Sequence, residues 1–320
     1  MISHKFLLPF TQWNHIRNFR LPGKYWHNQK WVFVSDEPPA YRPVAEKYHH
    51  CFNITFTYRR DSDVYYPYGE MVDKTEELMK NTTSSAPATT NMTNEAKAKE
   101  RFLKKKNVLW VASNCHTTSA RENYVKELKK HIDVTTYGRC GIRTCKRDMF
   151  TVTNTSCIRN KQHEYRFYLA FENSLCKDYA TEKLWRTLTY DMIPVVYGLA
   201  DYSQFLPHKS YINVADFESP QHLAKYLKEI GKNWELFKEY MAWKETKAVR
   251  IDPFRRATCD LCEYLHRTKS ETRRKMVDLS EFWGAKATCK TPETVLPSLG
   301  VTYNSTEEGV NSAEEEKPFH

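Results

Sequence analysis

The stretch that decides the fold spans residues 166–198 and reads RFYLAFENSLCKDYATEKLWRTLTYDMIPVVYG. It begins with an apolar, aromatic run of strand length at 167–171, followed by a polar loop at 172–180. Thr181 then opens a segment with an apolar helical face, and a β-branched run follows at 193–197. Strand, loop, helix and strand in this order predict one unit of a parallel sheet. Ligands bind such sheets at the carboxyl ends of the strands, beside the helix N-termini.

Lys183 lies in the first turn of the predicted helix, where the helix dipole disfavours a cation by roughly 0.3–1 kcal/mol. A bound anion would reverse this penalty, because helix N-termini and ammonium groups both attract phosphate. The alternative is a lysine that reaches water or pairs with Glu182. The pattern alone does not separate the two.

A second strand–helix–strand unit spans residues 108–137. Its helix is expected to be capped by Ser119, with Glu122 three residues later as in a capping box. Arg121 then lies in the first turn, the position that Lys183 has in the other unit. We expect both cations at one edge of one parallel sheet.

The segment FYLAFENSLCKDYATEKLW closely resembles the donor-binding signature of the α1,3/4-fucosyltransferases, FxFENS…DYxTEK followed by a strand that ends VVxG. Further similarity runs from about residue 31 to about residue 264, with an interruption near residues 80–100. The resemblance implies an α/β fold of the GT-B type, with two facing Rossmann-like domains and the active site between them. The first domain is shorter here than is usual in the family.

The resemblance also implies an inverting glycosyltransferase that moves L-fucose from GDP-fucose, in α1,3 linkage, to a GlcNAc residue of a glycoprotein or glycolipid glycan. No cofactor is expected, and a divalent metal is at most stimulatory, because no DxD motif stands at a strand end in the donor half. Two alternatives remain open. The chain could bind nucleotide sugar or glycan without turnover, or use another nucleotide sugar as the donor.

Glu37 matches the general base of the family's Glu-Ser-Pro motif, although Pro38 replaces the serine, and Asp36 is the fallback. Without the resemblance, this loop reads as a solvated turn. The family's diphosphate-binding arginine matches Arg121, which with Lys183 would form a cationic clamp. The residues expected to hold the donor are Arg121, Asn173, Tyr179, Glu182 and Lys183.

Further candidates for the cleft are Arg59, Arg60, Ser113, Asn114, Tyr137 and Glu172. The two arginines belong to the block TYRRDSD at 57–63, which also resembles the family. The alternative for this block is a mainly structural loop tied by Arg–Asp pairs.

Length and composition limit the number of domains and the kinds of partner that the chain can have. The 320 residues suffice for about two domains, and 40% apolar and 14% aromatic residues can build sizeable cores. A net charge of +10 suits a polyanionic partner such as nucleic acid, a membrane surface or a nucleotide sugar. The basic residues are dispersed and no nucleic-acid motif accompanies them, so no nucleic-acid partner is expected.

Nine cysteines and five acceptor sequons indicate the secretory pathway. The candidate glycosylation sites are Asn53, Asn81, Asn91, Asn154 and Asn304. Cys259 and Cys262 form a CxxC with His266 and Cys289 nearby, which could supply zinc ligands. The secretory context favours disulfides at these cysteines instead.

No stretch reads as a signal peptide or membrane span. Members of the resembled family are single-pass type II proteins of Golgi cisternae, and this chain resembles only the lumenal part after their stem. We therefore expect the membrane anchor to be absent from this chain, as in a fragment, an incomplete gene model or an unusual isoform. The predicted divisions are a partial N-terminal acceptor domain at 1–79, a low-complexity linker or insertion at 80–100, a GDP-fucose-binding domain at 101–250, a cysteine-containing closing segment at 251–290 and a disordered polar tail at 291–320.

Overall fold

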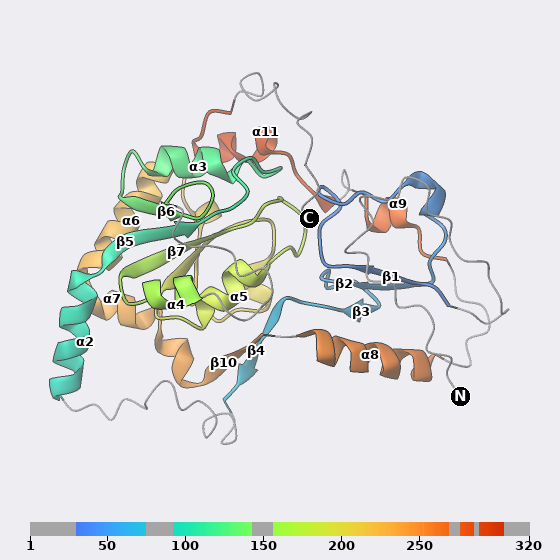
Figure 1. The fold of residues 1–320 in the computed structure, drawn as a ribbon, viewed down its shortest axis with the longest axis horizontal. Coiled ribbons are helices and arrows are strands. Elements are labelled where there is room, and N and C mark those ends of the chain that lie inside the picture. The colour runs from blue at the N-terminus through green and yellow to red at the C-terminus, as the bar shows by residue number, and fades with distance from the viewer. Residues whose placement is uncertain are drawn as a thin grey trace, which may run out of the picture.

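The computed structural model describes residues 30–74, 92–142, 156–251, 253–268, 276–284 and 288–303. It contains two units, each built on a parallel sheet, and Figure 1 shows them side by side. The predicted α/β fold class with two parallel-sheet units, the GT-B type, is confirmed. Within the described residues, no helix combines the length and apolar character that a membrane crossing requires.

The larger sheet has five parallel strands in the order β6-β5-β7-β8-β9. Its strands are β5 (Lys106–Val111), β6 (Val134–Tyr137), β7 (Tyr165–Phe171), β8 (Ile193–Tyr197) and β9 (Ile212–Asn213). All seven residues of β7 are buried, because helices cover both faces of the sheet. The chain adds β6 on one side of β5 and then β7 on the other side, so the direction of the connections reverses between β5 and β7. In parallel sheets a ligand crevice is expected where two such strands end.

Helices form a layer on each face of this sheet (Figure 1). The core of one face contains buried side chains of α2 (Met92–Lys104), α3 (Arg121–Leu128), α6 (Pro220–Lys232) and α7 (Trp234–Glu239). The opposite core includes side chains of α4 (Ser156–Lys161) and α5 (Glu182–Leu188). The predicted start of α6 is confirmed: Ser219 caps it, its hydroxyl accepting from the amide of His222, and Pro220 occupies the first turn.

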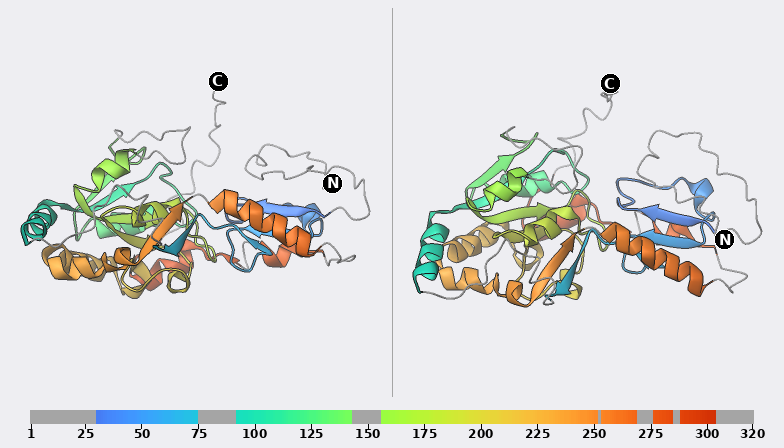
Figure 2. Two further views of the ribbon diagram at one scale, coloured as in Figure 1. Left: turned by 90° about the horizontal axis from the view of Figure 1, so that it is seen from below. Right: turned by 60° about the horizontal axis from the view of Figure 1, so that its bottom comes forward.

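The smaller sheet has three parallel strands in the order β1-β2-β3. They are β1 (Val32–Ser35), β2 (Ile54–Thr57) and β3 (Val64–Tyr65). One face packs against α8 (Pro253–Arg267), whose Ala257, Leu261 and Tyr264 are buried. The other face packs against α9 (Leu279–Phe282) and Trp283, and the views in Figure 2 show α8 lying along this sheet. Segments from the end of the chain thus complete the core of the first unit.

A two-stranded antiparallel ribbon joins the units. Strand β4 (Gly69–Asp73) pairs with β10 (Lys247–Ile251) along its whole length. A Cβ on Gly69 would lie 2.6 Å from ring atoms of Trp185, so the ribbon packs directly on α5. The apolar residues at 233–249 predict one continuous helix. The structure differs, because α7 ends at Glu239 and a 3-10 helix, η5 (Ala242–Glu245), separates it from β10.

Two predicted boundaries are corrected. Helix α2 begins at Met92, so the second part of the low-complexity segment 80–100 is helical and connects directly to buried Phe102. The tail is ordered through residue 303, with α11 (Pro292–Val295) followed by Leu296, Leu299 and Val301, all buried in the core of the second unit. Three apolar side chains anchor a segment whose overall composition is polar and acidic. Residues 304–320 lie outside the described residues.

Candidate active site

Arg121 occupies the first position of α3, beside the crevice between β5 and β7. Its guanidinium is 3% exposed and donates to the carbonyl oxygens of Phe171 and Asn114. Phe171 ends β7 and Asn114 follows β5, so one side chain spans both strand ends. Burial lowers the pKa of Arg121, although the group stays well within the charged range. Its Nε has no hydrogen-bond partner in the described structure.

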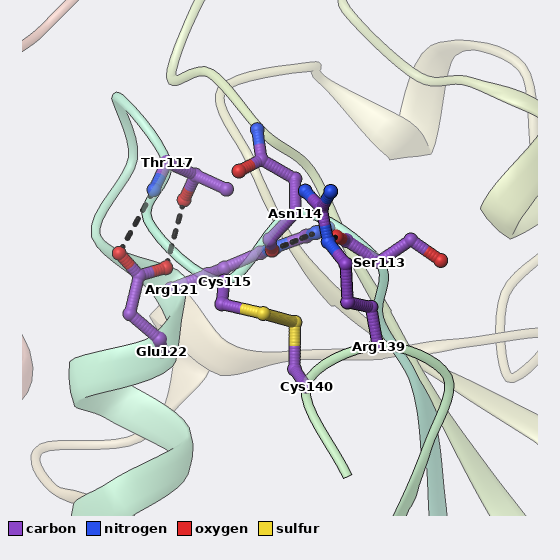
Figure 3. Close-up of a disulfide and its surroundings, with 8 residues drawn as sticks. All are labelled: Ser113, Asn114, Cys115, Thr117, Arg121, Glu122, Arg139 and Cys140. Carbon is purple, nitrogen blue, oxygen red and sulfur yellow. Dashed lines mark hydrogen bonds between the residues drawn. A yellow bond between two sulfur atoms is a disulfide. The ribbon is translucent and has the colours of Figure 1, made fainter. Parts of the chain in front are cut away.

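The expected capping box at this helix is wrong. The N-cap is Ala120, in the left-handed region with φ of 46°, and its side chain makes no capping bond. Ser119 instead donates to the carbonyl of Glu172 at 2.7 Å. Glu122 accepts from the amide and hydroxyl of Thr117, both at 2.9 Å (Figure 3). Ser119 therefore ties the loop after β5 to the loop after β7, whereas Glu122 fixes the loop after β5 to the start of α3.

A disulfide stabilises the loop after β5. Cys115 is bonded to Cys140, and Arg139 donates from Nε to the carbonyl of Ser113 at 2.7 Å (Figure 3). Ser113 and Asn114 thus lie at the strand end, as the sequence predicts for cleft candidates. Their backbone carbonyls accept from arginine side chains. The disulfide limits the movement of the segment that precedes Arg121.

Lys183 lies in the first turn of α5 and contacts carboxylates. Its amine is 3.0 Å from Oε2 of Glu172 and 3.6 Å from Oε1 of Glu182, and it also donates to the hydroxyl of Thr181 at 2.7 Å. Burial alone would lower the pKa of Lys183, but the two carboxylates outweigh it and the pKa is raised. Ion pairing, the alternative left open by the sequence, is therefore present. The main partner is Glu172 rather than the expected Glu182.

Glu172 organises the start of α5. Its side chain is 1% exposed and accepts from the amide of Thr181 at 2.7 Å as well as from the amine of Lys183. Arg121 and Lys183 interact electrostatically with Glu172 and with each other. The two cations therefore occupy the same region, at the carboxyl edge of the sheet.

Asn173 follows Glu172 and connects the two loops. Its carbonyl accepts from the amide of Ser119 at 2.9 Å and from the hydroxyl of Thr118 at 3.0 Å. Its side-chain Oδ1 is buried without a hydrogen-bond partner in the described part of the chain, as is Nε of Arg121. Buried polar atoms are normally satisfied, so these two unpaired atoms are unusual and lie close to the two strand ends. No group of three His, Cys, Asp or Glu side chains that could hold a metal occurs among the described residues.

Glu37 faces this edge from the first unit, in the turn that follows β1. The hydroxyl of Tyr179 donates to its Oε2 at 2.7 Å, across a separation of 142 residues. Burial raises the pKa of Glu37, and the hydrogen bond from Tyr179 only partly offsets this effect. A carboxylate with a raised pKa near other charged groups is suited to accept a proton.

Two tyrosines that sequence reasoning did not select support this turn. Tyr68 donates from its hydroxyl to the carbonyl of Asp36 at 2.6 Å. The ring of Tyr58 contacts the ring of Tyr179 in a tilted arrangement, with centroids 5.1 Å apart. Tyr58 lies in the block TYRRDSD that resembles the family and Tyr68 follows it, so the resemblance is the signal that could have found them.

The remaining candidates, Arg59, Arg60 and Tyr137, lie in different environments. Arg59 is buried and donates to Asp61 at 2.9 and 2.6 Å, which matches the structural alternative. Arg60 is exposed, and its backbone amide donates to Asp178 of the second unit at 3.1 Å. The side chain of Tyr137 lies in the core on the face of the sheet that α4 and α5 cover, with the amine of Lys161 in α4 5.1 Å from its ring centroid. The structure therefore does not bring Tyr137 together with the other candidates.

The cysteine prediction needs correction. Cys289 is bonded to Cys176, in the loop after β7, rather than to a member of the CxxC. Cys259 and Cys262 are exposed thiols on α8, because the apolar face of that helix is turned toward the first sheet.

Of the sequons, only Asn53 lies within the described residues. Its Oδ1 accepts from the amide of Trp31 and its Nδ2 contacts the sulfur of Met276, both at 2.9 Å. Asn81, Asn91, Asn154 and Asn304 lie outside that part of the chain.

Comparison with known proteins identifies the family. Residues 102–282 match the model of the glycosyltransferase family 10 (fucosyltransferase) C-terminal region, and residues 6–69 match the fucosyltransferase N-terminal region. A solved structure of an α1,3-fucosyltransferase with GDP-fucose is 20% identical, with a TM-score of 0.43 over 67% of this chain and 66% of that chain.

Two curated relatives are similar in sequence. The chain is 36% identical to 4-galactosyl-N-acetylglucosaminide 3-alpha-L-fucosyltransferase 9 of Rattus norvegicus over 75% of its length, and 36% identical to alpha-(1,3)-fucosyltransferase C of Drosophila melanogaster over 77%. It spans 60% and 57% of the lengths of these relatives. Since the C-terminal family model alone covers more than half of the chain, the protein belongs to glycosyltransferase family 10, the fucosyltransferases.

Proposed function

We propose that the protein transfers L-fucose from GDP-fucose to a GlcNAc residue of a glycan, in α1,3 linkage and with inversion at the anomeric carbon. One observation carries the proposal. Arg121 and Lys183 lie together where β5 and β7 end, and Glu37 faces them from the other unit through its hydrogen bond with Tyr179. This arrangement supports the proposal, in which a diphosphate would bind beside the two cations and Glu37 would accept a proton from the side of the first unit.

The chemistry needs one proton acceptor and one site for the leaving group. A hydroxyl oxygen of the acceptor forms a bond to the anomeric carbon while the bond from that carbon to the diphosphate oxygen breaks. The hydroxyl proton passes to Glu37, and GDP leaves with the bonding electrons. A single displacement of this kind inverts the configuration.

The cations stabilise the leaving group. Arg121 supplies a fixed positive charge, although its two terminal nitrogens already donate to backbone carbonyls, and Lys183 supplies a point charge; both are held before substrate arrives. Lys183 is already neutralised by Glu172, so GDP would have to share this lysine with a carboxylate. Asn173, with its unpaired Oδ1, would accept a hydrogen bond from a donor hydroxyl. Glu182, beside Lys183, is the last of the residues proposed to contact GDP-fucose in this loop.

We propose further that the reaction needs no metal ion, because Arg121 and Lys183 supply positive charge at the diphosphate. The acceptor would be a glycoprotein or glycolipid glycan. The site of action would be the lumen of Golgi cisternae, as the family resemblance implies, and the two described disulfides fit an oxidising compartment of this kind.

The test separates donor binding from transfer. GDP-fucose binding is measured by calorimetry, and transfer is measured on a panel of GlcNAc-containing glycans with EDTA present. We expect Glu37→Gln to bind GDP-fucose as the parent chain does but to lose transfer by about 10²-fold or more. Arg121→Lys keeps the charge but not the planar fork, so it should weaken donor binding. Donor binding by the parent chain without any transfer would contradict the proposal.

A further inference from the structure

Tyr179 is fixed in the cleft by its surroundings on both sides. It lies in the loop after β7 of the second unit and is 2% exposed. Its ring contacts Tyr58 at 5.1 Å and Tyr68 at 6.2 Å between centroids, both from the first unit. These rings leave the hydroxyl little freedom, and it donates to Oε2 of Glu37 at 2.7 Å.

The turn that carries Glu37 is held at its backbone as well. Ser35 donates from its hydroxyl to the carbonyl of Glu37 at 2.8 Å, and Tyr68 donates to the carbonyl of Asp36 at 2.6 Å. Oε1 of Glu37 makes no hydrogen bond within the described residues, whereas Oε2 is occupied by Tyr179. One oxygen of the carboxylate is therefore anchored and the other is open.

We propose that Tyr179 is a positioning residue for Glu37: its hydroxyl anchors Oε2, so that Oε1 is presented to the acceptor hydroxyl. This rests on the proposed function, in which Glu37 accepts the proton. It also gives Tyr179 a role different from the donor contact expected from the sequence. Because Tyr179 belongs to the donor-site loop, the orientation of the base depends on the unit that holds the nucleotide sugar.

The hydrogen bond has a measurable second effect. A hydrogen bond donated to a carboxylate stabilises its charged form, so the Tyr179 hydroxyl keeps the pKa of Glu37 lower than burial alone would set it. The other titratable groups that influence Glu37 are Asp36, Glu182 and Lys183, with Tyr58 and Tyr68 close by. None of them donates a hydrogen bond to this carboxylate within the described residues.

The test is the pH profile of Tyr179→Phe, which removes the hydroxyl and keeps the ring. We expect kcat to fall by about tenfold or more, since hydrogen bonds to charged groups are among the stronger ones. The acid limb of kcat/KM should move to higher pH, because the pKa of Glu37 rises when the hydrogen bond from Tyr179 is removed. KM for GDP-fucose should change by about twofold or less. Tyr124→Phe is the matched control, because its buried hydroxyl has no partner in the described structure, and its profile should match that of the parent chain.

Two outcomes would overturn the inference. One is an acid limb that does not move in Tyr179→Phe. The other is a loss expressed only in KM for GDP-fucose, which would make Tyr179 a donor contact. Replacing Tyr179 by 3-fluorotyrosine provides a second probe that preserves the packing. Its hydroxyl is a stronger donor, so the acid limb should move to lower pH.

Glu37→Gln separates this inference from the proposed function. If Tyr179 acts through Glu37, the double variant Glu37→Gln/Tyr179→Phe should be no slower than Glu37→Gln alone. Full transfer activity in Glu37→Gln would remove the base and the proposed mechanism with it. An inactive Glu37→Gln together with an unaffected Tyr179→Phe would leave the mechanism intact and reject only the positioning role.

Discussion

The amine of Lys183 lies 3.0 Å from Oε2 of Glu172, a carboxylate that is 1% exposed where β7 ends. Removing Lys183 leaves this buried charge without its cation, a change that costs about 3 kcal/mol or more when the partner is fully buried. Lys183 itself retains some contact with solvent, so we expect Lys183→Met to lower the free energy of unfolding by about 2 kcal/mol. Urea unfolding measures this difference.

The matched variant is Glu172→Gln in the Lys183→Met background, which removes the stranded charge and keeps a side chain of similar shape. It should recover part of the lost stability. If the double variant is as unstable as the sum of the single ones, the two side chains are not coupled as the contact indicates.

The approach of Tyr202 to Gly198 predicts a steric effect. A Cβ at Gly198, just after β8, would lie 2.6 Å from the hydroxyl oxygen of buried Tyr202. Gly198→Ala should therefore destabilise the fold by about 1–3 kcal/mol. The Tyr202 hydroxyl has no partner within the described structure, so Tyr202→Phe should be nearly neutral and should rescue Gly198→Ala.

Gly231 in α6 is the control for this prediction. A Cβ there meets its nearest atom only at 3.4 Å, and alanine is the better helix former, so Gly231→Ala should be neutral or stabilising. Thermal unfolding of the four variants decides the matter. Equal losses in Gly198→Ala with and without Tyr202→Phe would contradict the steric explanation.

The two disulfides should contribute unequally to stability. Cys115–Cys140 closes a loop of 25 residues and Cys176–Cys289 one of 113 residues. Loop-closure entropy predicts contributions of about 3.5 and about 4.8 kcal/mol. We therefore expect Cys289→Ala paired with Cys176→Ala to lower the free energy of unfolding more than Cys115→Ala paired with Cys140→Ala. The opposite order in guanidinium unfolding would show that local packing, rather than loop length, decides their contributions.

Glu37 links activity and stability to pH in opposite directions. Its pKa is raised in the folded state, chiefly by burial, so activity should fall on acidification at a pH above the usual carboxylate value of about 4.3. Between the unfolded and folded pKa values the folded state binds more protons, so stability decreases as pH rises through this window. Glu37→Gln removes the charge, and we expect it to be inactive but more stable than the parent chain at neutral pH. Parallel pH series of kcat/KM and melting temperature test both parts, and a less stable Glu37→Gln at neutral pH would contradict the second.

The sequence predicted the second unit well because its strands carry continuous apolar runs and its loops carry the family signature. β7 and α5 lie where the pattern placed them. The pattern failed where a residue serves a distant partner. Ser119 has the position of a cap in the sequence, yet its hydroxyl donates to Glu172, 53 residues away. Such partners are set by tertiary contacts, which local spacing does not encode.

The same reason explains what was missed around Glu37. The resemblance selected this carboxylate and Tyr179, but nothing in either motif showed that the two touch across 142 positions of sequence. Tyr68 was read as part of a structural block, and its hydrogen bond to Asp36 depends on how the ribbon leaves the first sheet. The polar composition of residues 291–320 predicts disorder, but a few apolar side chains such as Leu296, which is 0% exposed, are buried in the core.

The ribbon of β4 and β10 determines how the two units can move. Two of the covalent crossings between the units lie side by side in this ribbon and share a ladder of hydrogen bonds. The chain crosses once more between α9 and α11, where Cys289 is bonded to Cys176, so relative movement of the units must deform both connections. The ribbon packs on α5. Helix α5 therefore carries Lys183 and also supports the connection between the two units, so movement of the units relative to each other would act on the donor site.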